Sequence, residues 1–254
     1  MVALDVDGTL VDHDGRLPAD VRGAIRAVIA DDVPVILSTG RSWHGTVDLV
    51  EALGLPPGLS VCSNGAVTVR YPPQEIVSAI TFDPKRVLDT VLALAPHTLV
   101  AVEEVGIGYR LSREFPPGDL TGEMIIEDLD QLSSRPVTRV ILRDPDRSDT
   151  DFLTLADQLG LHGVSYFIGW SAWLDIAPEG VNKATALSKV AAELGVAQAD
   201  VLAMGDGRND IEMLRWAGRG VAMGDAPPEV KAAAAHVTGR FDDGGTVAEL
   251  RHWF

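Results

Sequence analysis

The chain has 254 residues, of which 46% are hydrophobic and 23% charged, a composition typical of a globular protein with a sizeable core. Its 37 acidic residues outnumber 21 basic ones, giving a formal charge of -16. This charge would repel nucleic-acid phosphates and anionic membranes, so neither is expected as a partner. No segment approaches the roughly 18 apolar residues of a membrane span, and no basic, apolar leader precedes the first predicted strand. We therefore expect a soluble, cytoplasmic protein.

Both ends of the chain alternate short apolar segments with helical patterns. This alternation predicts an α/β fold with a Rossmann-like parallel sheet covered by helices. We assign residues 1–81 and 179–254 to this core. Its predicted strands cover residues 2–6, 33–40, 59–66, 200–207 and 219–224, and its predicted helices cover 18–31, 43–54, 183–196 and 209–218.

The middle of the chain, residues 82–178, follows a different pattern. A predicted helix is followed by paired strands, twice over, which favours an inserted α+β domain with an antiparallel sheet. Pro and Gly place its hinges near residues 71–76 and 177–180, and residues 114–124 are predicted to form a surface loop. The predicted helices cover 83–95 and 149–160, and the predicted strands cover 98–105, 106–112, 138–144, 164–170 and 172–177.

Aspartates follow two of the core strands. Asp5 and Asp7 lie two positions apart, so on a strand their carboxylates would share a face and repel each other. Asp206 and Asp210 follow a later strand, and the carboxyl ends of parallel strands meet at one edge of a sheet. Carboxylates with no His or Cys nearby are ligands that suit Mg²⁺. The sequence therefore predicts a magnesium site at this edge.

Lys183 begins a predicted helix, where the helix dipole disfavours a cation. An anion held between this lysine and the first helical turn would remove the conflict. Gly8 and Gly40, at the ends of two strands, would let backbone amides approach the same anion closely. We interpret the anion as a phosphate group.

Five motifs occur in a fixed order along nearly the whole chain. Together they resemble the haloacid dehalogenase superfamily of phosphatases, and most closely its Cof-type branch, whose large cap domain is inserted between the second and third motifs. A single DxD or TGR motif would be weak evidence, whereas the ordered set is specific. The motifs are DVDGTL (5–10), STGR (38–41), SNGA (63–66), GVNKATAL (180–187) and GDGRND (205–210).

The resemblance implies roles for individual residues. Asp5 would be the nucleophile that forms an aspartyl phosphate, and Asp7 would protonate the leaving group and then activate water. Thr39 and Lys183 would hold the transferring phosphoryl oxygens. The resemblance also implies phosphate or substrate contacts from Gly8, Gly40, Arg41 and Asn64.

The resemblance further implies how magnesium is bound. Asp5, Asp206 and the backbone carbonyl of Asp7 would be its ligands, Asp210 would complete or support the set, and Asn209 would steady the carboxylates from behind. The chain departs from the commonest forms of the branch without losing a catalytic group. The departures are Asn182, Gly207 and Asp225.

Several residues also have a plain structural explanation. Arg41 is equally consistent with an exposed arginine at a helix start and with substrate binding. Trp43, Trp170 and Trp173 could line a pocket, but large aromatic residues more often pack, and packing is our interpretation.

Three functions remain open at this point. The first is a magnesium-dependent phosphatase acting on a small phosphorylated metabolite, with a sugar phosphate preferred. The second is a phosphomutase or phosphotransferase on sugar phosphates, and the third is a non-catalytic phosphometabolite-binding protein. The complete set of Asp5, Asp7, Lys183 and Asp206 argues against the third. A monomer and a homodimer are both compatible with the sequence.

Overall fold

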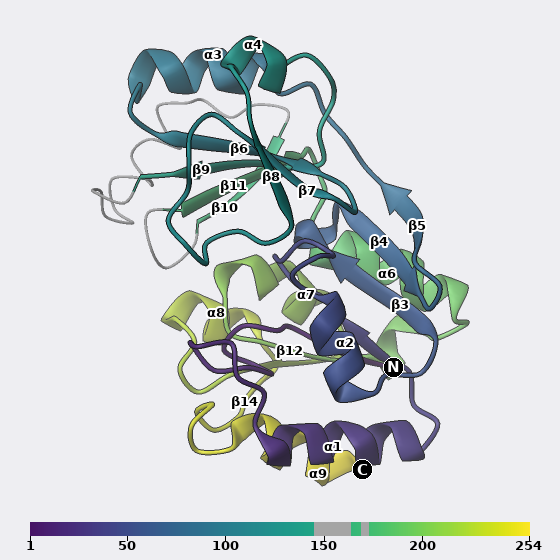
Figure 1. Cartoon of the computed structure of the whole chain (residues 1–254). Coiled ribbons are helices and arrows are strands. Elements are labelled where there is room, and N and C mark those ends of the chain that lie inside the picture. The colour runs from purple at the N-terminus through teal and green to yellow at the C-terminus, as the bar shows by residue number, and fades with distance from the viewer. Residues whose placement is uncertain (145–163, 169–172) are drawn as a thin grey trace.

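A computed structural model describes residues 1–144, 164–168 and 173–254 of the chain. Two regions are visible in Figure 1. The lower region, which we call the core, contains both chain ends. The upper region, which we call the cap, contains the elements from α3 (Lys85–Leu94) to β11 (Trp173–Pro178). Two connections join the regions, one before α3 and one after β11.

A parallel sheet lies at the centre of the core. Among the described residues it has five strands in the order β14-β13-β12-β1-β2. β1 pairs with both β2 and β12, so the segments around residues 5, 38 and 206 end at the same edge. β1, β2 and β12 are apolar and fully buried, as expected where helices cover both faces of such a sheet. They are β1 (Val2–Leu4), β2 (Val35–Leu37), β12 (Leu202–Gly205), β13 (Arg219–Ala222) and β14 (His236–Val237).

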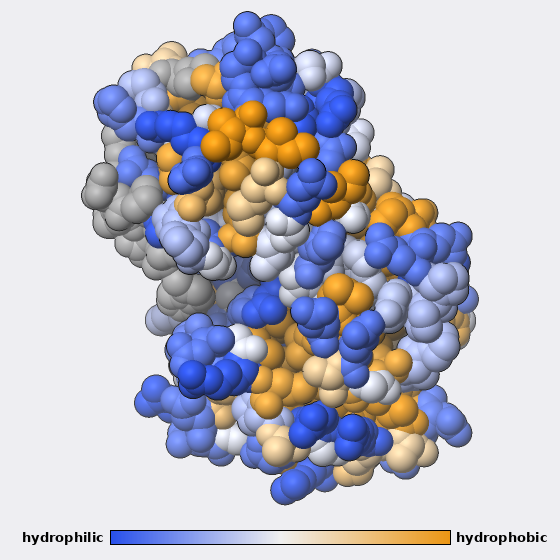
Figure 2. Space-filling view, in the orientation of Figure 1, coloured by the Kyte–Doolittle hydropathy of each residue, from blue (hydrophilic) through white to orange (hydrophobic). Residues whose placement is uncertain are grey.

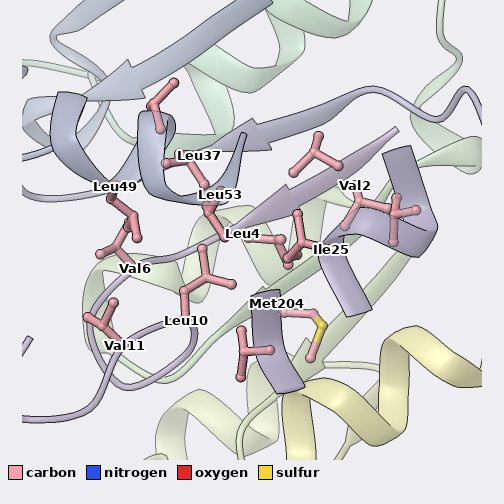
Figure 3. Packing of buried hydrophobic residues seen from close by; sticks show 14 of the residues in the cluster. Val2, Leu4, Val6, Leu10, Val11, Ile25, Leu37, Leu49, Leu53 and Met204 are labelled. Atoms are coloured by element: carbon pink, nitrogen blue, oxygen red, sulfur yellow. The ribbon is translucent and has the colours of Figure 1, made fainter. Parts of the chain in front are cut away.

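The helices of the core bury one face each. In α1 the residues Val21, Ala24, Ile25 and Val28 follow the helical repeat and are buried. Figure 3 shows Ile25 packed near Leu4 of β1 and other buried apolar side chains. Full burial of such a side chain contributes about 1.5–3 kcal/mol. The helices are α1 (Ala19–Ala30), α2 (Val47–Leu53), α6 (Lys183–Glu193), α7 (Ile211–Trp216), α8 (Pro228–Ala233) and α9 (Gly245–Trp253).

A three-stranded antiparallel sheet stands beside the parallel sheet. It consists of β3 (Gly58–Cys62), β4 (Val67–Tyr71) and β5 (Glu75–Ala79), and a parallel bridge between Ser38 and Val61 joins it to β2. The predicted hinge at 71–76 is therefore wrong, because residues 72–74 form the turn between β4 and β5. Proline marks an interruption of regular structure but does not distinguish a hairpin turn from a linker.

The cap is built on a mixed sheet with α3 and α4 on one side (Figure 1). The described strands of this sheet lie in the order β10-β11-β9-β6-β7-β8, and only the pair β7 and β8 is parallel. The helix predicted over 149–160 and Trp170 lie outside the described residues. The remaining cap elements are β6 (Leu99–Glu104), β7 (Gly108–Leu111), β8 (Glu123–Ile126), α4 (Leu129–Leu132), β9 (Val140–Arg143) and β10 (Val164–Ile168).

The predicted surface loop at 114–124 extends too far. Its last two residues, Glu123 and Met124, begin the edge strand β8. All four residues of β8 are exposed, so the sequence lacks the alternation that reveals a half-buried strand. Among the helices of the described residues, none is long and apolar enough to cross a bilayer.

Candidate active site

The polar residues that follow the core strands meet at one edge of the parallel sheet. Asp5 follows β1, Thr39 follows β2 and Asp206 follows β12, and these three strands are neighbours. The backbone N–H of Asp5 bonds to the carbonyl of Met204 at 3.0 Å, which extends the ladder past the end of β1. The predicted convergence at the carboxyl edge follows from the parallel pairing.

Lys183 lies between two carboxylates in the interior. Its Nζ is 2.6 Å from Asp5 Oδ1 and 2.5 Å from Asp210 Oδ1, and its side chain is fully buried. Burial would lower the pKa of Lys183, but Asp210 and Asp5 raise it above the ordinary value, so the ammonium stays charged. Lys183 is the first residue of α6, and the preceding Asn182 caps that helix by accepting from the Thr185 N–H at 2.9 Å.

Three aspartates form an acidic group next to this ammonium. Asp5, Asp206 and Asp210 each offer a carboxylate oxygen, and the three oxygens lie within 4.8 Å of one another. Burial, and then the charge of Asp210, raise the pKa of Asp5 well above its ordinary value and that of Asp206 to about 7. Buried carboxylates that repel one another accept a hard divalent cation readily. The all-oxygen donor set therefore fits a magnesium ion.

Close packing of the loops leaves no room for a side chain at two positions of the site, Gly205 and Gly8. Asp210 Oδ2 accepts from the N–H groups of Asp206 at 3.0 Å and Gly207 at 2.9 Å, which closes the turn after β12. A Cβ at Gly205 would lie 2.4 Å from the Asp210 side chain. Gly8 has φ +76°, and a Cβ there would lie 2.5 Å from Asp206 Oδ2. Larger residues at either position would push the carboxylates apart.

Asp7 and Arg41 form an ion pair at the rim of the site. Arg41 Nη2 lies 2.5 Å from Asp7 Oδ1, and Arg41 Nε lies 3.0 Å from Oδ2, which is the paired geometry typical of arginine and carboxylate. The Asp7 side chain is exposed and lies outside the acidic group. Arg41 is not at a helix start, because α2 begins at Val47. The structure therefore places Arg41 against the residue expected to be the acid and base.

Asn64 joins the core to the cap. Ser63 and Asn64 have φ of 52° and 54°, a left-handed conformation that is unfavourable for serine and more tolerable for asparagine. This turn directs the Asn64 amide so that Nδ2 donates to Asp175 Oδ2 of the cap at 3.2 Å. Asn209 Nδ2 donates to Asn64 Oδ1 at 2.9 Å. Asn209 thus contacts Asn64, whereas the resemblance implied contact with the carboxylates.

A cleft of about 590 Å³ lies between core and cap. Figure 2 shows hydrophilic residues where the two regions meet. Asp5, Asp7, Gly40, Arg41 and Asp206 contribute to the core side of the cleft. The cap side, which we call the cap wall, is formed by Tyr109, Gly118, Asp119, Leu120, Thr121, Arg139, Trp173 and Asp175.

Arg139 ties the cap to the core. It is buried, it donates to the Gly40 carbonyl, and its Nη2 lies 2.5 Å from the Tyr109 hydroxyl. Its guanidinium also lies 3.5 Å from Glu103 and 3.6 Å from Asp175. Glu103 in turn accepts from the Ser63 hydroxyl of the core at 2.8 Å. Arg139 and Glu103 of the cap are therefore bonded to the two loops that follow β2 and β3.

Asp175 has an incomplete set of partners. Burial raises its pKa, while the charge of Arg139 and the indole of Trp173 act in the opposite direction. Its Oδ2 accepts from Asn64, but its Oδ1 has no hydrogen-bond partner of normal geometry among the described residues. An acceptor buried without a donor costs about 1–3 kcal/mol.

Comparison with known proteins identifies the family. The family model for haloacid dehalogenase-like hydrolases matches residues 2–250. The chain belongs to this family. Phosphoglycolate phosphatase of Natronomonas pharaonis is 32% identical over 244 residues, covering 96% of this chain and 93% of the relative. The 5-amino-6-(5-phospho-D-ribitylamino)uracil phosphatase YcsE of Bacillus subtilis is 26% identical over 270 residues, covering 100% and 95%.

Solved structures of the family have the same fold. A sugar phosphatase of haloacid dehalogenase subclass IIB matches with a TM-score of 0.84 and 20% identity, covering 99% of this chain and 98% of that one. A haloacid dehalogenase-like hydrolase from B. subtilis matches with a TM-score of 0.85 and 22% identity, covering 100% and 99%. The predicted Cof-type phosphatase family, the α/β class and the assignment as an enzyme are confirmed.

The residues predicted from the motifs fall into two places. Asp5, Lys183 and Asp210 are buried and in contact, and the half-buried Asp206 lies next to them. Around this group are loop residues Thr39, Gly8, Gly40, Asn64 and Asn209. Asp7 and Arg41 pair with each other at the rim.

Sequence reasoning missed the charged residues of the cap. Glu103, Arg139 and Asp175 are charged residues beside or within apolar strand segments, the same anomaly that drew attention to Asp5. That signal was present in the sequence, but it does not reveal that the three residues meet.

Proposed function

We propose that this protein is a magnesium-dependent phosphatase that hydrolyses a small phosphorylated metabolite, with a sugar phosphate as the preferred class, through an aspartyl phosphate on Asp5. The observation that carries this proposal is the buried Asp5, held by Lys183 beside two further aspartates at the floor of a polar cleft. The relatives named above are phosphatases of small organic phosphates, and one structural neighbour is a sugar phosphatase.

In the first step, a carboxylate oxygen of Asp5 attacks phosphorus and the bond to the leaving oxygen breaks. Asp7, in its protonated form, gives its proton to that oxygen, so the product leaves as an alcohol. Arg41 must loosen its pairing with Asp7 for this transfer, because both carboxylate oxygens of Asp7 accept from Arg41. Lys183 and Thr39 hold the phosphoryl oxygens, and Gly8, Gly40, Arg41 and Asn64 complete the phosphate pocket.

In the second step, Asp7 takes a proton from a water molecule whose oxygen attacks the phosphorus. The bond between phosphorus and Asp5 breaks, which releases inorganic phosphate and restores the carboxylate. Lys183 keeps its charge throughout and reduces the repulsion between Asp5 and the phosphate. Magnesium, held by Asp5, Asp206, the Asp7 carbonyl and Asp210, would supply positive charge for the phosphoryl oxygens. Asn209 steadies this edge through Asn64.

A screen of a few dozen metabolite phosphates for release of inorganic phosphate, with magnesium present, tests this proposal. We expect release from several hydroxylated substrates and none from a matched Asp5→Asn sample. Phosphate transfer to a second hydroxyl without release would instead identify a mutase. We further propose residues 82–178 as the cap domain, a cytoplasmic location, and a monomer or homodimer.

A further inference from the structure

The arginines at the cleft are already engaged with carboxylates. Arg41 pairs with Asp7, and Arg139 lies within 3.6 Å of both Glu103 and Asp175. Arg208, which also lines the cleft, pairs with Glu229 at 2.7 Å. Among the described residues that line the cleft, each arginine therefore has an acidic partner.

The cap wall instead presents hydrogen-bond acceptors. Asp119 and Asp175 both line it. Asp119 Oδ2 accepts from Arg143 Nε at 3.0 Å, and Asp175 is more than nine-tenths buried with its Oδ1 unpartnered among the described residues. An ionised carboxylate only accepts hydrogen bonds, so a ligand that completes this wall must bring donors.

A flat apolar surface lies beside these acceptors. Trp173 and Asp175 are two residues apart on β11, so their side chains share a face of the strand, and both line the cleft. Trp173 is half-buried and packs edge-on against Phe115, with ring centroids 6.4 Å apart. The sequence analysis favoured a packing role for Trp173. In the structure Trp173 both packs against Phe115 and lines the cleft.

We propose that the cap wall selects an uncharged, hydroxyl-bearing leaving group and disfavours one that carries a carboxylate. This inference rests on the proposed phosphatase function. Hydroxyl groups donate to Asp175 and Asp119 while the carbon chain lies against Trp173. A leaving group with a carboxylate brings acceptors and a like charge to the same wall, whose arginine, Arg139, already faces Glu103 and Asp175.

Two substrates that differ at a single carbon test this selection. D-Glucitol 6-phosphate and 6-phospho-D-gluconate share a six-carbon chain, and a terminal CH₂OH in the first replaces a carboxylate in the second. We expect kcat/KM to be at least about tenfold higher for glucitol 6-phosphate. Equal or higher kcat/KM for phosphogluconate would overturn the inference. Failure to hydrolyse p-nitrophenyl phosphate as well would count against the proposed function itself.

Substitution of the two acceptors sharpens the test. Asp119→Asn removes the partner of Arg143 and leaves that guanidinium positive charge near the cleft, and Asp175→Asn removes the second negative charge. Each change should shift the ratio of kcat/KM values toward phosphogluconate by about tenfold. Rates with p-nitrophenyl phosphate, measured for each variant, correct for any loss of folded enzyme.

The matched control is Asp130→Asn, which makes the same chemical change on an exposed residue of α4 away from the cleft. We expect its substrate ratio to equal that of the unmodified protein. If Asp175→Asn fails to fold, Asp119→Asn alone still decides the matter, because Asp119 is only partly buried. An unchanged ratio in the folded variants, or the same shift in Asp130→Asn, would contradict the proposal.

Discussion

The core and the cap each bury a cation among carboxylates, and the two clusters differ in their balance of charge. In the core, Lys183 faces Asp5 and Asp210, and Asp206 adds a third carboxylate nearby. In the cap, Arg139 faces Glu103 and Asp175 and also bonds to Gly40 and Tyr109. The core cluster has three carboxylates to one ammonium and the cap cluster has two carboxylates to one guanidinium, so the excess of negative charge is larger in the core, which suits a metal ion.

The chemistry of Lys183 and of Arg139 suits the role that we infer for the cluster around each. The ammonium of Lys183 is a compact charge that can move from carboxylate oxygens to phosphate oxygens. The guanidinium of Arg139 is planar and has several fixed donors, so it can join two carboxylates, a carbonyl and a phenol at once. We infer that the core cluster serves chemistry and the cap cluster fixes the position of the cap.

The largest effect is expected from Asp5→Asn. The amide cannot act as the nucleophile and is a weaker metal ligand, so kcat should fall by more than about 10³-fold. Phosphate release from a purified variant, free of wild-type and deamidated protein, is the measurement. Substantial activity in that sample would remove Asp5 from the mechanism.

Removal of the metal tests the excess charge of the core cluster. Activity should fall to background in a chelator and return with Mg²⁺, because Asp5, Asp206 and Asp210 then regain a shared counterion. Calcium should suppress activity, since its looser coordination misaligns the nucleophile and phosphorus. Full activity in excess chelator would show that the acidic group has another purpose.

Asp7→Asn separates proton transfer from binding. The loss in the phosphorylation step should reach about 10²–10⁴-fold for a sugar phosphate, whose alkoxide needs a proton to leave. It should be smaller for p-nitrophenyl phosphate, because that phenolate leaves without one. Single-turnover measurements with both substrates isolate this step. Equal losses for the two would refute the acid role of Asp7.

Arg139→Met tests the cap cluster. The change leaves Glu103 and Asp175 buried without a counterion, which typically costs about 3–5 kcal/mol of stability. The folded fraction should show a KM for metabolite phosphates raised about tenfold or more, with a smaller change for p-nitrophenyl phosphate. Arg135→Met is the matched control, because that side chain is 56% exposed. Equal effects of the two substitutions would argue against a positioning role for Arg139.

The smallest effect concerns pH and stability without metal. Burial, and then the charge of Asp210, raise the pKa of Asp206 from 3.8 to about 7 in the folded protein. The folded state therefore binds this proton more tightly than the unfolded state, and the resulting stability is lost as pH rises through about 7. Without metal, Tm should fall between about pH 5 and pH 8. Added Mg²⁺ should raise Tm more at the higher pH, because the metal needs ionised carboxylates. A Tm that rises with pH would contradict this.

The sequence by itself determined the family, the parallel core and the polar residues that meet at its carboxyl edge. Asp5, Asp206, Asp210 and Lys183 stand in local motifs at strand ends and at a helix start, and parallel pairing of buried strands then brings them together. Lys183 at the beginning of α6 was also informative, because a cation at the start of a helix is locally unfavourable.

Only the tertiary structure decided the partners of Asp7, Asn64 and Asn209 and the composition of the cap wall. Asp7 and Arg41 are 34 positions apart, and Asn64 and Asp175 are 111 apart. The first contact depends on how two loops of the core pack and the second on how the core and the cap pack, which no local spacing encodes. The hairpin of β4 and β5 and the edge strand β8 escaped prediction for a related reason. Proline marks a turn without saying what it joins, and an edge strand exposed on both faces has no alternation of burial to detect.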